Sequence, residues 1–188
     1  MRNRFFLPAL TLVFLAVVPA RAGEEYSIDP AHTAVGFKIS HLGLSWTYGR
    51  FNDVAGTFVL DSEAGKCSFN VTIKVASIDT GNQKRDEHLR GEDFFAEKKF
   101  PTMSFKSTSV KAVKDGYQVT GDFTLRGVTR SITFTLVGGR TVEFPRGVKR
   151  TGFSTELTLK RSDFGMDRFK DAVGDEVYIA ISFEGTKK

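Results

Sequence analysis

Cysteine is almost absent from this sequence, and so are the motifs that identify several classes of enzyme. Cys67 is the single cysteine among 188 residues, so no internal disulfide can form and the fold must be held by a hydrophobic core. The sequence contains no G-x-S-x-G, G-x-x-x-x-G-K or G-x-G-x-x-G pattern. It therefore lacks the signatures of serine hydrolases, P-loop proteins and dinucleotide-binding enzymes.

Histidine is also scarce, which bears on metal binding. The chain has three histidines, His32, His41 and His88, and no two of them are four residues apart on one helix face, as a metalloprotease helix requires. Zinc takes three or four protein ligands, mostly His or Cys, and no glycine-turn calcium loop is present. The sequence predicts neither a bound metal nor a cofactor.

No apolar run is long enough to span a bilayer. Arg2 and Arg4 precede an apolar stretch over residues 5–18, and an A-x-A site follows, ending at Ala22. This pattern is typical of a secretory signal peptide, whereas a membrane span needs about 20 apolar residues. We expect a signal peptide over residues 1–22, cleaved after Ala22, and one exported domain over residues 23–188 without a stable membrane anchor.

An excess of one charge sign is missing as well. The full chain has a formal net charge of +5, but removing residues 1–22 takes away three arginines and leaves a charge of about +2. Nucleic-acid binding depends on concentrated positive charge. We therefore expect no nucleic-acid partner.

Alternation of apolar and polar residues dominates residues 23–188, and it predicts strands with one buried face. Short turn signals such as Asp115-Gly116 link the strands and favour antiparallel neighbours. About eight such strands can close into a barrel without exposed edges; a two-sheet sandwich is the alternative. The strands are expected at residues 33–40, 51–61, 67–77, 102–110, 117–125, 131–137, 151–159 and 176–185.

The alternation stops after residue 79, and a short helical crossover is predicted near residues 82–96, with Asp79 or Thr80 as its cap. Its alternating charges are typical of a helix face in solvent. An enzyme built on this segment would use His88 with Asp86 or Glu92, and those side chains would have to face a cavity.

Phenylalanine is abundant, with 18 in the chain, and most of those beyond residue 22 lie on apolar strand faces. A close-packed aromatic core explains this pattern. An eight-stranded barrel can instead leave room for a slender ligand. Composition favours the packed core but does not decide between the two.

Longer stretches of the sequence resemble a known family. They are ISHLGLSWTYGRFNDVAGTFVLD, VASIDTGNQKRDEHLRGEDFF, FPTMSFKSTSV, VTGDFTLRGVTRSITFTL, RTGFSTELTLKRSDFGM and VGDEVYIAISFEG, in order along residues 39–185. Together they resemble the YceI-like family of exported polyisoprenoid-binding proteins, over essentially all of residues 23–188.

This resemblance implies an antiparallel lipocalin-like barrel with an apolar tunnel for an isoprenoid chain, such as a quinone tail or a polyprenyl phosphate. It also implies the bacterial periplasm and a possible homodimer, and it transfers no catalytic residue. We therefore expect a non-enzymatic carrier; the alternatives are an enzyme at the barrel mouth and a protein-interaction scaffold with a filled interior.

Strand alternation then supplies the residues expected to face the ligand. The predicted ligand-binding residues are Phe37, Ile39, Phe58, Val71, Ile73, Phe105, Val119, Phe123, Phe134, Phe153, Ile179 and Ile181. Lys38, Thr72, Asp122 and Ser182 are expected to point outward. Gly56 and Gly121 are expected either to leave room in the tunnel or to bend a strand. The candidates for head-group contact are His32, His41, Trp46, Tyr48 and Arg50.

Overall fold

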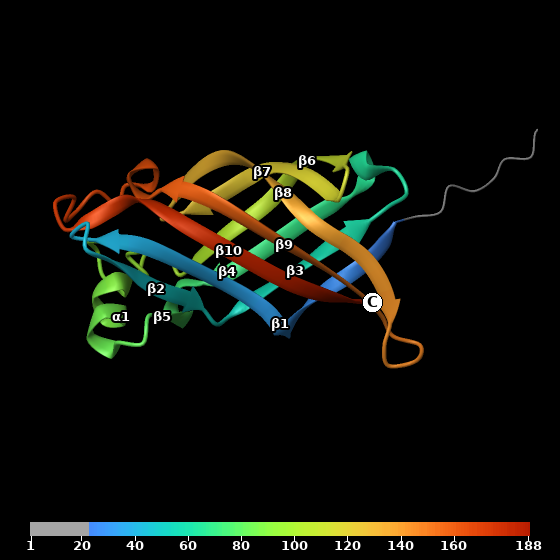
Figure 1. Cartoon of the computed structure of the whole chain (residues 1–188), viewed down its shortest axis with the longest axis horizontal. Coiled ribbons are helices and arrows are strands. Elements are labelled where there is room, and N and C mark those ends of the chain that lie inside the picture. Colours follow the sequence, from blue (N-terminus) through green and yellow to red (C-terminus); the bar gives the residue numbers. More distant parts are fainter. Residues whose placement is uncertain (1–22) are drawn as a thin grey trace, which may run out of the picture.

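The computed structural model describes residues 23–188 (Figure 1). The predicted signal peptide lies outside the described residues. Helical segments are α1 (Gln83–Arg90) and three short 3-10 turns, η1 (Ala64–Lys66), η2 (Val75–Ser77) and η3 (Arg161–Phe164). The strands are β1 (Glu24–His41), β2 (Ser45–Phe51), β3 (Val54–Leu60), β4 (Ser68–Lys74), β5 (Ile78–Asp79), β6 (Thr102–Val113), β7 (Gly116–Leu125), β8 (Val128–Glu143), β9 (Lys149–Lys160) and β10 (Val173–Lys187).

The strands form a closed antiparallel barrel. Around the ring the order is β1, β3, β4, β6, β7, β8, β9 and β10, and the pairing of β10 with β1 closes it. The strands β2 and β5 extend the sheet from β1, outside this ring. The eight-stranded antiparallel barrel is thus confirmed, and the sandwich alternative is wrong.

The first strand of the barrel changes its partner along its length. Its first residues pair with β3, whereas Val35–His41 pair with β2, and β10 runs along its other edge. A register shift between Asp29 and Ala34 lies at the change of partner. Neither β2 nor the first part of β1 was predicted as a strand.

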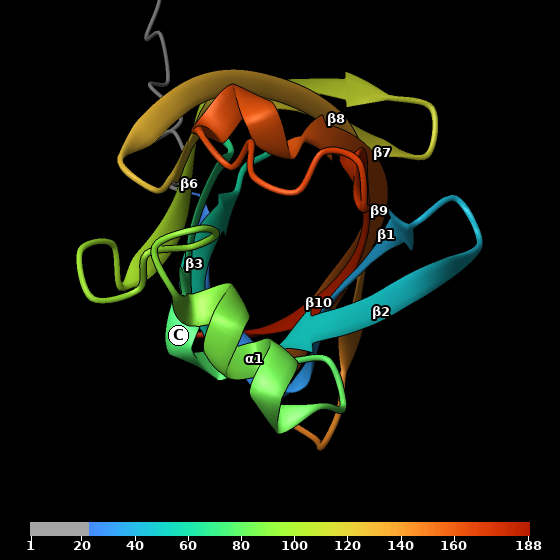
Figure 2. The same cartoon turned by 90° about the vertical axis from the view of Figure 1, so that its left-hand side faces the viewer.

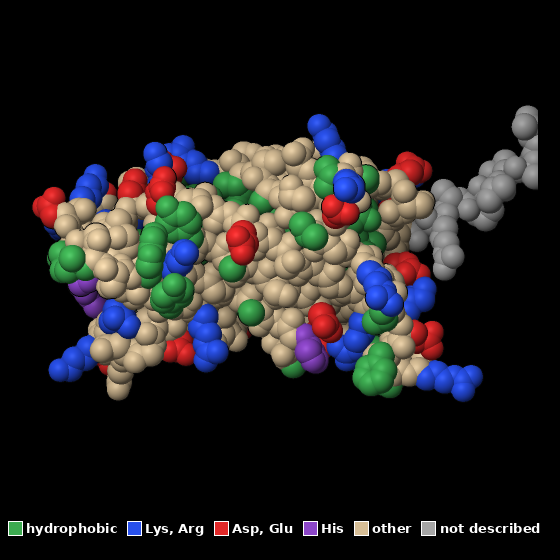
Figure 3. Space-filling view, in the orientation of Figure 1, with side chains coloured by type: hydrophobic (Ala, Val, Ile, Leu, Met, Phe, Trp, Pro, Cys, Tyr) green, Lys and Arg blue, Asp and Glu red, His purple; other side chains and the backbone are tan. Residues whose placement is uncertain are grey.

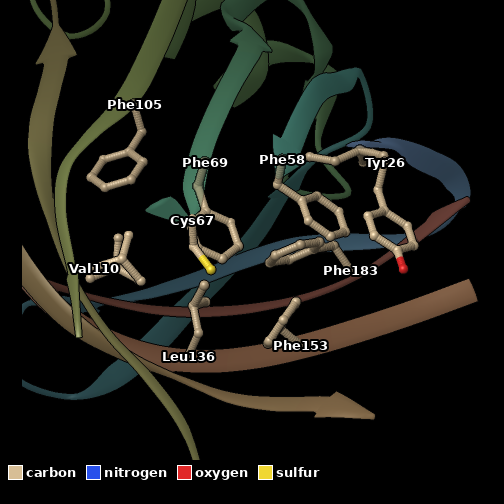
Figure 4. Packing of buried hydrophobic residues seen from close by; sticks show 11 residues of the cluster. Tyr26, Phe58, Cys67, Phe69, Phe105, Val110, Leu136, Phe153 and Phe183 are labelled. Atoms are coloured by element: carbon tan, nitrogen blue, oxygen red, sulfur yellow. The ribbon is translucent and has the colours of Figure 1, made fainter. Parts of the chain in front are cut away.

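Aromatic side chains pack tightly at one end of the barrel, which we call the closed end (Figure 4). Phe58 is at the centre: its ring stacks on Tyr26 at 5.1 Å and on Phe69 at 5.7 Å, and meets Phe153 and Phe183 edge-on at 5.9 and 5.7 Å. Stacked and edge-to-face pairs at these separations stabilise a core beyond simple burial. This end of the barrel is therefore filled by its own side chains.

The opposite end of the barrel carries α1 and the loop that begins with η3, which lie on facing sides of the opening (Figure 2). Apolar residues from β1, β2, β4 and β6 continue the core toward this end. No helix in residues 23–188 has the length and apolar character that a membrane span requires. Basic and acidic side chains are intermingled on the outer surface (Figure 3).

Candidate ligand cavity

An apolar cavity of about 450 Å³ lies inside the barrel between the closed end and α1. Its deep part is bounded by Phe69, Leu136 and Phe183, which belong to the packed cluster of the closed end. Its outer part is bounded by Leu89 of α1 and by Phe169 of the loop after η3, a half-exposed side chain. Pockets that bind small molecules fall in this range of size and are mostly lined by apolar side chains.

The predicted inward face agrees with the structure. Thr72, Asp122 and Ser182 are exposed, and Lys38 lies on the outer surface with its Nζ 4.9 Å from the Trp46 ring centroid. Of the predicted ligand-binding residues, those that line the cavity are Phe37, Ile39, Val71, Ile73, Phe105, Phe123, Phe134, Ile179 and Ile181.

Three other predicted ligand-binding residues, Phe58, Val119 and Phe153, do not line the cavity. They are at most 3% exposed and lie in the packed cluster of the closed end. Alternation gives the face of a strand but not the depth at which the barrel is filled, so these three were wrongly placed at the cavity wall.

The two glycines expected to leave room in the tunnel do not line the cavity either. A Cβ atom on Gly56 would lie 2.2 Å from the carbonyl oxygen of Asn70, and one on Gly121 would lie 2.5 Å from that of Lys106. Both glycines therefore permit close approach of neighbouring strands. Leucine at either position would collide with the backbone of the barrel rather than shorten the cavity.

The predicted crossover helix is confirmed as α1, although its cap and its buried face differ from the prediction. Asn82, not Asp79 or Thr80, caps it by accepting a hydrogen bond from the backbone N–H of Arg85 at 3.0 Å. Asp86 is buried rather than in solvent, and accepts from the backbone N–H and hydroxyl of Thr80 at 2.9 and 2.6 Å. Asp86 thus fixes the turn that precedes α1.

His88 lines the cavity at its mouth, but the structure does not assemble the expected acid–base group around it. Asp86 is bonded to Thr80, and Glu92 accepts from Lys99 at 3.1 Å. The carboxylate that lies near His88 is that of Asp93, with 3.4 Å between Nε2 and Oδ2. Among residues 23–188, no three His, Cys, Asp or Glu side chains are grouped so that they could hold a metal ion.

Only one of the predicted head-group candidates lines the cavity, and that is His41. Trp46 and Tyr48 are exposed on the outer surface of β2, where Trp46 meets Tyr178 edge-on at 5.3 Å. Arg50 pairs with Asp79 at 3.2 Å. The Nδ1–H of His32 donates to the carboxylate of Asp29 at 2.9 Å, and His32 does not line the cavity.

Three basic residues that the sequence did not predict line the cavity: Arg85, Lys160 and Arg161. Arg161 is only 3% exposed, and burial lowers the pKa of its guanidinium below the ordinary value. Its Nε, Nη1 and Nη2 donate to backbone carbonyls of Gly174 at 2.8 Å, Met166 at 2.6 Å and Val173 at 2.9 Å. These bonds hold the loop between η3 and β10 across the barrel end.

The fold is a lipocalin-like barrel whose apolar cavity is closed at one end by packed side chains and open at the other. A barrel of this size can hold one small ligand. Residues 26–185 match the model of the YceI-like domain. The chain is 41% identical over 181 residues to Protein YceI of Escherichia coli O17:K52:H18, covering 95% of this chain and 94% of that protein. The chain belongs to the YceI-like family.

Solved structures share this fold. BcnA of Burkholderia cenocepacia superposes with a TM-score of 0.75 at 26% identity, covering 84% of this chain and 98% of BcnA. A polyisoprenoid binding domain from Saccharophagus degradans gives a TM-score of 0.65 at 17% identity, covering 89% of this chain and 100% of that domain. The latter likeness shows the fold alone.

Proposed function

We propose that this protein is an exported carrier that holds the chain of an isoprenoid lipid in the barrel cavity without converting it. The apolar cavity of about 450 Å³ is the observation that carries the proposal. Membership of the YceI-like family supports it, and so does the structural neighbour named as a polyisoprenoid binding domain. The carrier would transport, store or sequester the lipid.

Burial of hydrocarbon supplies the affinity in this proposal. Each methylene moved from water to an apolar site contributes about 0.8 kcal/mol, so a five-carbon isoprene unit contributes about 3–4 kcal/mol before ordering costs. The side chains that would contact the isoprenoid are those that line the cavity, among them Phe37, Phe105, Phe123, Phe134 and Ile181.

The predicted signal peptide supports export, and the family resemblance supports the periplasm. Fractionation of the host cell tests this location.

A homodimer is also part of the proposal, because the β1–β2 hairpin exposes Leu44 (83%), Tyr48 (64%) and Trp46 (44%) on the outer surface. Light scattering of the wild type and of Leu44→Ser tests the dimer, which the variant should weaken.

Native mass spectrometry of the protein purified from its own host tests the carrier function. A co-purified lipid of definite, unchanged mass is the expected result. A protein that arrives without lipid and takes up no prenyl compound would contradict the proposal, and chemical conversion of an added prenyl lipid would favour the enzyme alternative.

A further inference from the structure

The charged side chains that line the cavity all carry the same sign. Among the described residues they are Arg85, Lys160 and Arg161, and the lining also includes His41 and His88 but no aspartate or glutamate. The outer face shown in Figure 3, in contrast, carries both signs. On a protein with nearly balanced charge, a random distribution of charged residues would not be expected to put cations alone along an otherwise apolar cavity.

Arg161 is the most buried of these cations, and no carboxylate of the described residues forms an ion pair with it. Its known partners are the neutral carbonyls of Gly174, Met166 and Val173. Asp175 and Asp167 both act on its charge without direct contact, and Asp175 is itself engaged by the backbone N–H and hydroxyl of Ser162 at 3.0 and 2.8 Å. A buried cation without a direct counter-ion is costly unless an anion joins it.

Arg85 is held in a fixed position at the facing side of the opening. Its Nε donates to the Thr80 hydroxyl and its Nη2 to the Thr80 carbonyl, both at 2.7 Å. Thr80 is fixed in turn by the buried Asp86. The guanidinium is therefore positioned by a hydrogen-bond chain and is not neutralised by direct contact with a carboxylate of the described residues.

Two acidic residues near the mouth, Asp93 and Glu92, are paired with other side chains. Asp93 lies 3.4 Å from Arg168 and 3.4 Å from His88, and Glu92 pairs with Lys99. The side chain of Lys160, in contrast, forms no hydrogen bond or ion pair with another described side chain, and Asp175 acts on its charge only from a longer distance. Positive charge is thus left available where the apolar cavity meets solvent.

We infer that the cavity mouth binds an anionic head group, a phosphate or a carboxylate, on a ligand whose chain lies in the apolar interior. This inference rests on the proposed function and narrows it from isoprenoids in general to those with a charged head. An anion at the mouth receives charge-assisted hydrogen bonds that a neutral quinone or alcohol receives only weakly. One such bond is expected to change affinity by about tenfold or more.

The test compares ligands that share a chain and differ in the head group. Protein stripped of lipid is titrated with geranylgeranyl phosphate and geranylgeraniol, and with a long-chain fatty acid and the alcohol of the same length, by displacement of a fluorescent apolar probe. The wild type should bind at least one anion about tenfold more tightly than its matched alcohol. The phosphate and carboxylate pairs together show which anion is preferred.

Two double variants that each lose two positive charges show whether the preference for the anion depends on the cations that line the cavity. Arg85→Gln with Lys160→Gln removes two cations of the lining, whereas Lys84→Gln with Lys170→Gln removes two exposed cations that do not line the cavity. The first should lose most of the preference for the anion and keep its affinity for the alcohol; the second should keep both. Arg161→Gln, checked for an unchanged melting temperature, should act like the first variant.

The outcomes separate this inference from the proposed function. Equal binding of anion and alcohol by the wild type overturns the head-group inference and leaves the carrier function intact. An equal loss in the two double variants also overturns it, because the effect would then come from net charge alone. Failure of every ligand to bind overturns both proposals.

Discussion

The cavity is expected to limit the length of the chain that the protein accepts, and Val71 is the position at which to test this. Val71 lines the cavity and packs against both the closed-end cluster and the core around the open end. A larger side chain at this point should separate the deep part of the cavity, near Phe69 and Leu136, from the mouth. Val71→Phe should therefore shorten the space for a prenyl chain.

The magnitude follows from the hydrocarbon that loses its site. Exclusion of one isoprene unit removes about 3–4 kcal/mol of gross burial, and roughly 0.5–1.5 kcal/mol of ordering cost is saved. The net loss of about 2–3 kcal/mol corresponds to about 30- to 150-fold in affinity for the longest chains. Chains that end before Val71 should bind as they do to the wild type.

The assay is competition within a series of prenyl alcohols of increasing length, so that the head group is constant. Thr72→Phe is the matched control, because Thr72 is the next residue on β4 and is exposed on the outer surface. Added bulk in a packed interior costs about 1–3 kcal/mol of stability, so the melting temperatures of both variants are measured as well. The same length preference in both variants would refute the proposed position of the chain.

Three further predictions concern the stability of the fold. Phe58→Ala should destabilise the fold by about 3–5 kcal/mol in chemical denaturation because Phe58 is 1% exposed and central to the closed-end cluster; a loss below 1 kcal/mol would contradict this packing. Lys187 and Lys149 lower the pKa of Glu24 to about 2 from its ordinary value of 4.5, so stability should be constant above about pH 4.5 and fall as pH drops toward 2. Glu24→Gln should flatten that fall, and an unchanged acid profile would exclude this carboxylate as its source. Asp86→Asn should cost about 1–3 kcal/mol by weakening the bonds to Thr80 without removing bound lipid, and loss of the lipid in a folded variant would contradict this prediction.

Strand alternation was sufficient to predict the ring strands and their inward face, because one face of each ring strand must be apolar. It left the barrel and the sandwich open, and the family resemblance decided for the barrel. Alternation could not reveal β2, in which the large side chains Trp46 and Tyr48 point outward and the opposite face carries Thr47 and Gly49 before the buried Phe51 that ends the strand. A pattern with large apolar residues in solvent and small ones inside does not resemble a buried strand. Its pairing with β1 and β5 defines it.

The cavity wall was predicted better than the mouth of the cavity. Arg85 belongs to a helix whose charges all appeared to belong in solvent, and Arg161 lies in a segment without periodicity. Their approach depends on how α1 and the loop after η3 fold over the barrel end, which is a tertiary arrangement without a local signal. The depth to which side chains fill the closed end could not be predicted from the sequence either. Phe58 and Phe105 occur in similar alternating patterns, but only Phe105 faces the cavity.

A crystal structure of the protein purified from its own host, with its co-purified lipid retained, tests the central claim most directly. The account predicts continuous density for one chain inside the barrel, from Phe69 to the mouth between α1 and the loop after η3. It also predicts a head group within hydrogen-bond distance of Arg85, Lys160 or Arg161. A lipid bound on the outer surface, with side chains filling the interior, would contradict the account.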